Sequence, residues 1–476
     1  MNENQKKLGL LSLIAMIIGS TIGSGVFTIT GDMAANGAHT GAIVIGWIIC
    51  GLGIYCLLQC FSGLNGERPD LVSGIFSYAR EGFGEYMGFI SAYGYWVSAL
   101  FTNVSYLALL FTTMNTFIPI FGNGSNLIST ILGLVIVWIA CLVVLRGVKE
   151  AAVLNIFTTI AKLIPLFVFI IAVIVVRAFD PAVFMHNFWG ADEMPVLAQI
   201  KATSSSTVWS FIGVEGAVVL STRAKNSKDV TRSTFIGFAC LFIIYVLVAL
   251  LSMGVIPHEE LATMENPQLA GILSAAVGPW GALLVKIGII LSIIGAMLGW
   301  TILTVEAPAA AAQQDIFPKR FGKMNKFGAP SFTLILTTFI ISFFIVLGYF
   351  STKAYLLFYN LCVSMIMLPY LFSAMFYFKM GITGKGFEHG KFSVTHAKIF
   401  GCLGTIYGLW MIYASGLSYI LVTTTLYAPG IYIYYKARKE QGLSTFDHNY
   451  EKYLAAGITL LGVLSIVLLV TGKIVL

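Results

Sequence analysis

The amino-acid sequence predicts an all-α polytopic membrane protein that folds as a single domain over residues 1–476. Composition is the first observation: hydrophobic residues make up 58% of the chain and charged residues only 10%, whereas soluble globular domains carry about 25% charged residues. The second observation is that apolar residues gather in runs of about 20, the length that a helix needs to cross a bilayer. A transmembrane β-barrel would instead show short segments of alternating polarity.

Thirteen apolar runs are long enough to be transmembrane helices. The polar head 1–7 leads directly into the first run, which is too long for the apolar part of a signal peptide, so we expect no cleavable signal. In chain order the runs lie at 8–29, 41–63, 86–114, 127–145, 152–177, 203–221, 233–255, 279–307, 331–349, 354–378, 398–416, 418–435 and 454–475. Only Ser415 and Gly416 separate the eleventh from the twelfth, so a count of twelve spans stays open.

The first span contains a segment that does not suit a helix in lipid. Residues 19–25 read Gly-Ser-Thr-Ile-Gly-Ser-Gly, and these glycines and serines lower helix propensity near mid-membrane depth. Two interpretations stay open on this segment alone. Gly19 and Gly23 could form a small-residue packing face between helices, or the backbone could unwind where it lines a polar cavity. Discontinuous helices of the second kind hold the substrate in secondary transporters.

The sixth span carries a glutamate in the middle of an apolar run. Glu215 lies between Gly213 and Gly216, so we expect this span to be interrupted as well. An ionisable group at mid-bilayer costs at least about 2.5–3.5 kcal/mol and marks a functional site by default. The expected role of Glu215 is to bind a cationic group, to exchange a proton, or both. The alternative is a protonated, hydrogen-bonded packing residue.

Lys162 lies midway along the fifth span, and Pro165 three residues later indicates a locally strained helix. The lysine is too deep to reach the membrane surface easily. Two roles are equally favoured: a structural partner for the carbonyl groups of the broken first span, or a proton shuttle with a pKa lowered by burial. If Lys162 fills the position where other transporters bind a coupling cation, sodium coupling is not expected.

The distribution of basic residues predicts the orientation in the membrane. With the N-terminus in the cytoplasm, most of the 28 Lys and Arg residues fall on the cytoplasmic side, as the positive-inside rule requires. The exceptions in the opposite loops are Arg177, Lys201, Lys353 and Lys473. The net charge of +7 is therefore a topology signal and not a nucleic-acid patch.

The first and sixth spans indicate an internal repeat. Each has a glycine-interrupted centre and each begins a group of five spans, so the second group is inserted upside down relative to the first. We expect a first repeat at 8–177, a second, inverted repeat at 203–378 and additional helices at 398–476. Inverted repeats of this kind are typical of transporters that bind their substrate at the midplane of the membrane.

Two segments also resemble a known family. Residues 19–27, Gly-Ser-Thr-Ile-Gly-Ser-Gly-Val-Phe, resemble the first-span signature of the amino acid–polyamine–organocation superfamily. Residues 209–215, Trp-Ser-Phe-Ile-Gly-Val-Glu, resemble the sixth-span signature of its basic amino acid/polyamine antiporters. Shorter matches lie at 95–104, 145–150, 299–301 and 368–371. The likeness is greatest to arginine/ornithine exchangers, with histidine/histamine exchangers also near. It implies a five-plus-five inverted-repeat bundle with the LeuT-like fold.

The resemblance also implies a site between the two broken spans. First-span backbone around Ser24 and Gly25 would hold the substrate carboxylate, sixth-span carbonyls would meet its amino group, and a tryptophan face would hold a cationic side chain. The substrate-binding residues implied are Thr21, Ile22, Gly23, Ser24, Gly25, Asn103, Trp209, Ile212, Glu215 and Trp300. The implied coupling or gating residues are Lys162 and Glu215. Relatives commonly have Trp in place of Leu100 and Gly in place of Thr102, which leaves room for a substrate other than arginine.

Several function classes are excluded by what the residues lack. The seven cysteines fall in apolar runs without metal-ligand spacing, and all six histidines fall in expected loops. No Walker A loop, HExxH motif or nucleophile elbow is present. We therefore expect no catalytic residues, no metal and no cofactor. The expected partners are amino acids, amines and the lipid bilayer, and a homodimer is one option for assembly.

The expected function is alternating-access exchange of a cationic amino acid for its metabolic product in the plasma membrane, of the arginine/ornithine type. Two alternatives stay open. One is exchange of histidine for histamine, or of another amino acid for its decarboxylated amine. The other is proton-coupled uptake of an amino acid.

Overall fold

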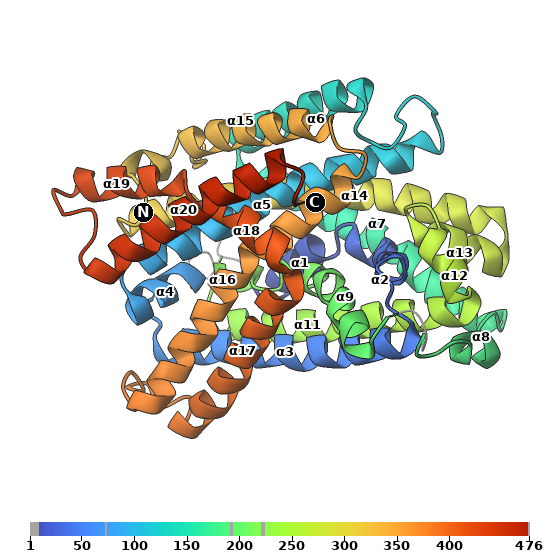
Figure 1. Cartoon of the computed structure of the whole chain (residues 1–476), viewed down its shortest axis with the longest axis horizontal. Coiled ribbons are helices and arrows are strands. Elements are labelled where there is room, and N and C mark those ends of the chain that lie inside the picture. Colours follow the sequence, from blue (N-terminus) through green and yellow to red (C-terminus); the bar gives the residue numbers. More distant parts are fainter. Residues whose placement is uncertain (1–8, 72–73, 191–193, 220–223, 475–476) are drawn as a thin grey trace.

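Helices make up nearly all the regular structure of the protein. The computed structural model describes residues 9–71, 74–190, 194–219 and 224–474. Within these ranges ten helices are long and apolar enough to cross a membrane, and each overlaps one of the predicted spans. They are α3 (Thr40–Glu67), α5 (Glu85–Asn115), α6 (Leu127–Arg146), α7 (Val148–Val175), α11 (Ser227–Val255), α14 (Pro279–Gln313), α15 (Ser331–Gly348), α16 (Ala354–Thr383), α17 (Val394–Ser415) and α20 (Asn449–Val470). Most run between the two ends of the bundle that lie left and right in Figure 1.

Three predicted spans are not continuous helices. The first is split into α1 (Leu10–Thr21), a 3-10 turn at Gly25–Phe27 and α2 (Ile29–Ala35). The sixth is split into α9 (Val196–Trp209) and α10 (Gly216–Val219). Both interruptions were predicted from glycine. The run at 418–435 was expected to be one helix, but it forms α18 (Leu417–Tyr427) and α19 (Gly430–Glu440), because Pro429 cannot donate a backbone hydrogen bond.

Short helices occupy four of the connections between spans. They are α4 (Ile75–Phe83), α8 (Pro181–Met185), α12 (His258–Thr263) and α13 (Gln268–Val277). These four helices were not predicted from the sequence. Helices α12 and α13 matter for function, because α12 packs on α2 and α13 packs on the 3-10 turn of the first span.

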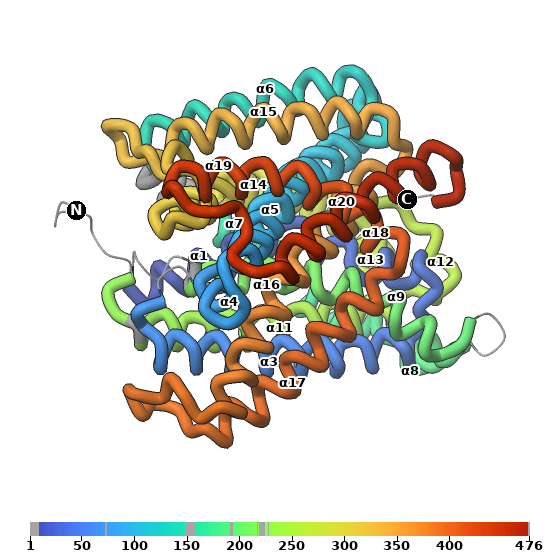
Figure 2. The backbone as a smooth tube through the Cα atoms, turned by 60° about the vertical axis from the view of Figure 1, so that its left-hand side comes forward, coloured from blue at the N-terminus to red at the C-terminus, as the bar shows by residue number. Residues whose placement is uncertain are grey.

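The centre of the bundle is formed by α5 and α16, which pack against each other. In the most apolar window of α5, 89% of the residues are buried, whereas the figure for α20 is 17%. Figure 2 shows α6 and α15 side by side along one edge and α17 along the other. These peripheral helices present apolar residues such as Phe339, Ile406 and Leu460 outward, as expected for a surface in lipid.

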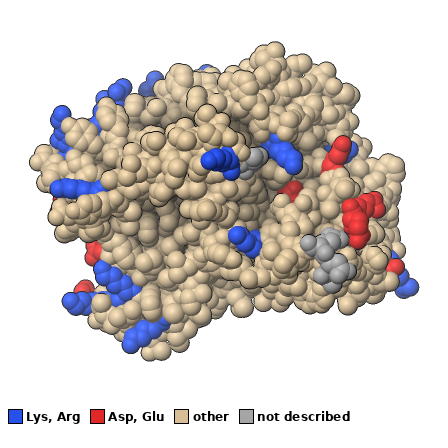
Figure 3. Space-filling view, viewed as in Figure 1, with Lys and Arg blue, Asp and Glu red and all other residues tan. Residues whose placement is uncertain are grey.

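Charged side chains lie mainly at the two ends of the bundle. In Figure 3, Lys and Arg gather at the end where α19 lies. This end, which we call the basic end, includes Lys319, Arg320 and Lys436. The opposite end includes Glu259 and Glu260 of α12, and we call it the acidic end.

Candidate functional site

The first span opens its backbone between α1 and α2. Helix α1 ends at Thr21, and the backbone N–H groups of Ser24 and Gly25 donate no hydrogen bond within the described ranges. The hydroxyl oxygen of Thr21 is buried and also has no partner there, and the buried hydroxyl of Ser24 faces Tyr355 without a well-aligned hydrogen bond. The break therefore presents a row of unpaired polar groups, including two N–H donors, in the middle of the membrane span.

The carbonyl groups freed by the same break are occupied by other helices. The ammonium of Lys162, on α7, donates to the Gly19 carbonyl at 2.5 Å and to the Ile22 carbonyl at 2.6 Å. The indole N–H of Trp300, on α14, donates to the Ser20 carbonyl at 3.0 Å.

Two hydroxyl groups continue this pattern. Tyr245 of α11 donates to the Thr21 carbonyl at 3.1 Å, and Ser292 of α14 donates to the Gly23 carbonyl at 2.7 Å. The carbonyls are thus satisfied by the protein while the N–H groups are left open. This asymmetry favours an anion, because the backbone groups that remain available are donors.

The break in the sixth span lies directly against the break in the first. Gly213 has φ of +107°, a conformation that favours glycine. A Cβ atom there would lie 3.1 Å from the Thr21 hydroxyl and 3.2 Å from the Ser20 hydroxyl. The two interrupted segments therefore touch.

Glu215 is fully buried at this junction. One carboxylate oxygen accepts from the Gly213 N–H at 3.0 Å and from the Tyr370 hydroxyl at 2.5 Å. The other oxygen faces the hydroxyl of Tyr95, and the two atoms do not form a well-aligned hydrogen bond. This oxygen is therefore the acceptor of the carboxylate that the described residues satisfy least.

Aromatic rings form the wall of the site on the side of α5 and α16. Trp209 lies edge-on to Tyr106 at 5.7 Å and to Tyr359 at 5.0 Å between ring centroids. A Cβ on Gly25 would lie 2.8 Å from Trp209, so the indole packs against the first-span backbone. The missing side chain at Gly25 is therefore what allows Trp209 to sit beside the unpaired N–H groups.

Asn103 and Ile212 complete the predicted set. Asn103 donates through its amide nitrogen to the Ala99 carbonyl and to Thr304, while its amide oxygen is buried without a partner in the described part of the chain. Ile212 is buried in the sixth-span turn, and its N–H makes a long 3.3 Å bond to the Trp209 carbonyl.

The structure brings the predicted residues together and closes them off from solvent. Ser24 and Glu215 are 0% exposed, Asn103 and Trp300 1%, and Trp209 5%. Four residues of the site were not predicted from the sequence: Tyr106, Tyr245, Ser292 and Tyr359. Hydroxyl-bearing residues are common inside polytopic helices, so these four carry no local signal, and only the fold reveals their contact with the broken spans.

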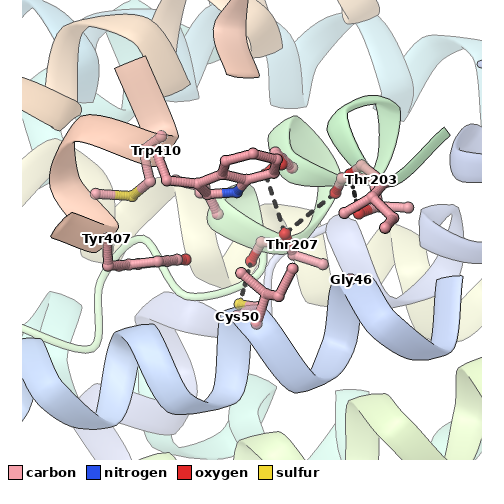
Figure 4. Close-up of a pocket in the computed structure, with 11 residues that line it drawn as sticks. Gly46, Cys50, Thr203, Thr207, Tyr407 and Trp410 are labelled. Carbon is pink, nitrogen blue, oxygen red and sulfur yellow. Dashed lines mark hydrogen bonds between the residues drawn. The ribbon is translucent and has the colours of Figure 1, made fainter. Parts of the chain in front are cut away.

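A small pocket elsewhere in the bundle does not compete with this site. Figure 4 shows it between α3, α9 and α17, lined by Cys50, Thr203, Thr207, Tyr407 and Trp410. Its volume of about 10 Å³ holds about one water molecule. Thr207 donates to its own helix at 3.0–3.1 Å, and the Cys50 thiol donates to the Thr207 carbonyl. The pocket is a packing gap that no amino acid can enter.

A larger hollow of about 720 Å³ lies at the basic end, between the end of α14 and α4. Its walls include the carboxylates of Asp70, Glu81, Glu85 and Asp315. Arg68 donates to Asp70 at 2.8 and 2.9 Å, and this guanidinium holds the pKa of the Asp70 carboxyl below its usual range. The Asp70 carboxylate is thus ionised at neutral pH. Among the described residues, none from the broken spans lines the hollow, so it is separate from the candidate site.

Known proteins resemble this chain over nearly its whole length. Residues 8–434 match the family described as amino acid permease. The chain is 38% identical over 467 residues to the arginine/ornithine antiporter of Pseudomonas aeruginosa, covering 96% of each chain. It is 38% identical over 484 residues to the arginine/agmatine antiporter of Chlamydia pneumoniae, covering 99% of each. With its ten membrane-length helices and two broken spans, the chain therefore belongs to the amino acid permease family of multi-pass membrane transporters.

Proposed function

We propose that the protein is an alternating-access antiporter that exchanges a cationic amino acid for its metabolic product, such as arginine for ornithine. The observation that supports this most is the asymmetry of the first-span break, whose carbonyls are occupied by Lys162, Tyr245, Ser292 and Trp300 while its N–H groups stay open. The two relatives named above, an arginine/ornithine and an arginine/agmatine antiporter, support an amino acid as cargo.

In this proposal the ends of the cargo bind to different walls. The carboxylate accepts hydrogen bonds from the N–H groups of Ser24 and Gly25 and from the nearby Thr21 hydroxyl. The cationic side chain packs on the face of Trp209, a contact worth about 2 kcal/mol when it is desolvated. The unpaired oxygens of Asn103 and Glu215 accept from its N–H groups.

The proposed orientation follows the positive-inside rule. The basic end, with the N-terminus, faces the cytoplasm, and the acidic end faces outward across the plasma membrane. Residues 8–177 and 203–378 are the two inverted repeats that move relative to each other around the site.

Two other cargoes or couplings fit the same site. An amine without a carboxylate would keep the wall formed by Asn103, Trp209 and Glu215, so exchange of an amino acid for its decarboxylated amine is one alternative. The other is a proton-coupled permease, in which Lys162 or the free oxygen of Glu215 carries the proton.

Exchange in liposomes separates these possibilities. We expect purified protein in liposomes that contain unlabelled arginine or ornithine to take up labelled arginine. Empty liposomes under an inward proton gradient are expected to take up almost none. Equal uptake by empty and loaded liposomes would mean a permease. Uptake driven by internal agmatine or histamine, but not by internal ornithine, would identify an amino acid/amine exchanger.

The substitution Glu215→Gln tests the cationic wall. It preserves the size of the side chain but removes the charge, and charge-assisted hydrogen bonds contribute about 1.5–3 kcal/mol. We therefore expect the ratio of maximal rate to KM for arginine exchange to fall about 10- to 100-fold.

Glu451→Gln is the matched control, because Glu451 is also fully buried with one carboxylate oxygen unpaired among the described residues. Unlike Glu215, it lies at the start of α20, remote from the broken spans. Its KM for arginine is expected to be unchanged. Equal losses in the two variants would contradict a cargo-binding role for Glu215.

A further inference from the structure

A second buried carboxylate lies outside the candidate site, toward the acidic end. Asp32 is on α2, the half of the broken first span beyond the cargo site, and only 5% of it is exposed. No basic side chain in the described ranges forms an ion pair with it. Aspartate is almost never buried this deeply without a cationic partner, because an unpaired charge is costly away from water.

Its neighbours supply hydrogen bonds but none of the missing charge. The amide nitrogen of Gln268, on α13, donates to Asp32 at 3.3 Å, a long bond. Thr28 and Asn266 are the other polar side chains beside the carboxylate. A glycine permits this arrangement, since a Cβ on Gly31 would lie 2.2 Å from the Gln268 side chain.

The same amides leave two acceptors unused. The side-chain oxygens of Gln268 and Asn266 are buried, and neither accepts a hydrogen bond from the described residues. Gln268 itself is only 4% exposed. The cluster of Asp32, Asn266 and Gln268, which we call the Asp32 subsite, therefore combines a carboxylate with two unpaired amide oxygens.

The Asp32 subsite is linked to the cargo site through one layer of side chains. Thr28 lies 3.1 Å from the hydroxyl of Tyr355 and donates to the Gly25 carbonyl at 3.3 Å. Tyr355 lies beside Tyr359, whose ring contacts Trp209. Both tyrosines are close enough to interact electrostatically with the Asp32 carboxylate.

We propose that the Asp32 subsite binds the cationic group of the cargo, a guanidinium or primary ammonium, on the acidic side of the candidate site. This inference rests on the proposed function and adds a second cation-binding position to it. A guanidinium carries five N–H donors in one plane, so it can satisfy a carboxylate and neighbouring amide oxygens together. The Asp32 subsite selects cationic cargo before it reaches Trp209.

Asp32→Asn tests the inference in vesicles of both orientations. We expect the KM for arginine presented to the acidic end to rise about tenfold or more, since a charge-assisted bond is roughly twice as strong as a neutral one. From the basic end the KM is expected to be unchanged, because the subsite lies on one side only. The maximal rate at saturating arginine is expected to change little from either end.

Gln268→Glu is expected to act in the opposite direction, lowering the KM at the acidic end by placing a second carboxylate beside Asp32. It keeps the inference testable if Asp32→Asn fails to fold. Glu260→Gln is the control for general attraction, since this exposed carboxylate on α12 lies at the same end outside the subsite.

The outcomes separate the inference from the proposed function. Absence of arginine exchange by the unaltered protein would refute the proposed function. Normal exchange with an unchanged KM in both Asp32→Asn and Gln268→Glu would refute the subsite alone. The assay is repeated in choline, sodium, potassium and calcium chloride at equal ionic strength. A KM that depends on one inorganic cation, and loses that dependence in Asp32→Asn, would mean that the subsite holds a metal ion and would overturn the inference.

Discussion

Gly23→Ala is expected to reduce exchange by about 100-fold, because displacing a positioned group by about 1 Å costs that much in rate. The added Cβ would lie 1.7 Å from the Tyr106 hydroxyl oxygen, 2.3 Å from Cζ and 3.0 Å from Cε1. Tyr106 is buried and its ring lies edge-on to Trp209, so it cannot move without moving the indole. Overpacking of this kind costs about 1–3 kcal/mol, so the variant is expected to fold and to fail in transport.

The control for this prediction is Gly216→Ala, on the other broken span. A Cβ there has only the Ser20 hydroxyl nearby, at 3.7 Å, which is ordinary contact. Its exchange rate is expected to stay within about twofold of the unaltered protein, as for other substitutions without a named mechanism. Initial rates of arginine exchange in liposomes, at equal amounts of monodisperse protein, measure both. Full activity of Gly23→Ala would mean that Tyr106 does not close on Gly23 during transport.

Lys162→Met is expected to lower the stability of the protein by about 3 kcal/mol, because a buried group left without its partner costs about 1–3 kcal/mol. Methionine keeps the length of the side chain but donates nothing to the Gly19 and Ile22 carbonyls, which now lie 2.5 and 2.6 Å from the ammonium. The carbonyl groups at the end of α1 would lose the hydrogen-bond donor that fixes their positions. Thermal unfolding in detergent is the measurement, and arginine exchange is expected to fall with it.

The two interpretations of Lys162 predict different results in this experiment. If Lys162 is structural, Lys162→Met lowers the melting temperature and leaves the pH profile of the remaining exchange unchanged. If Lys162 carries a proton, Lys162→Met abolishes the pH dependence of exchange with little change in the melting temperature. In both cases exchange by the unaltered protein is expected to be independent of sodium. A strong sodium dependence would contradict the assignment of Lys162 to the cation position.

Much of the fold could be predicted because a bilayer imposes simple rules on sequence. Length and polarity identified the ten continuous spans, and glycine identified both broken ones. The bend between α18 and α19 was missed, although Pro429 is a local signal for it. Short helices such as α12 and α13 were missed because they lie in connections, where neither length nor apolar content distinguishes a helix from a loop.

The site was predictable to the extent that its residues violate those rules. Glu215 and Lys162 are conspicuous because charge is rare in apolar spans. Tyr370 and Ser292 are ordinary in such spans, and their roles depend on contacts with residues far away in sequence, at the Glu215 carboxylate and the Gly23 carbonyl. Asp32 was overlooked because it lies just beyond the expected end of the first span, where a carboxylate is unremarkable.

The uneven hydrogen bonding of the first-span break affects whether the carrier can change conformation without cargo. In the proposed binding mode, the Ser24 and Gly25 N–H groups and the Asn103 oxygen acquire partners when the carrier closes over cargo. When the carrier closes without cargo, these groups are buried without partners, which costs about 1–3 kcal/mol of free energy for each group. An unloaded carrier therefore meets a higher barrier to turning around than a loaded one. The unpaired groups of one backbone turn thus provide a physical basis for obligatory exchange, without a separate gate.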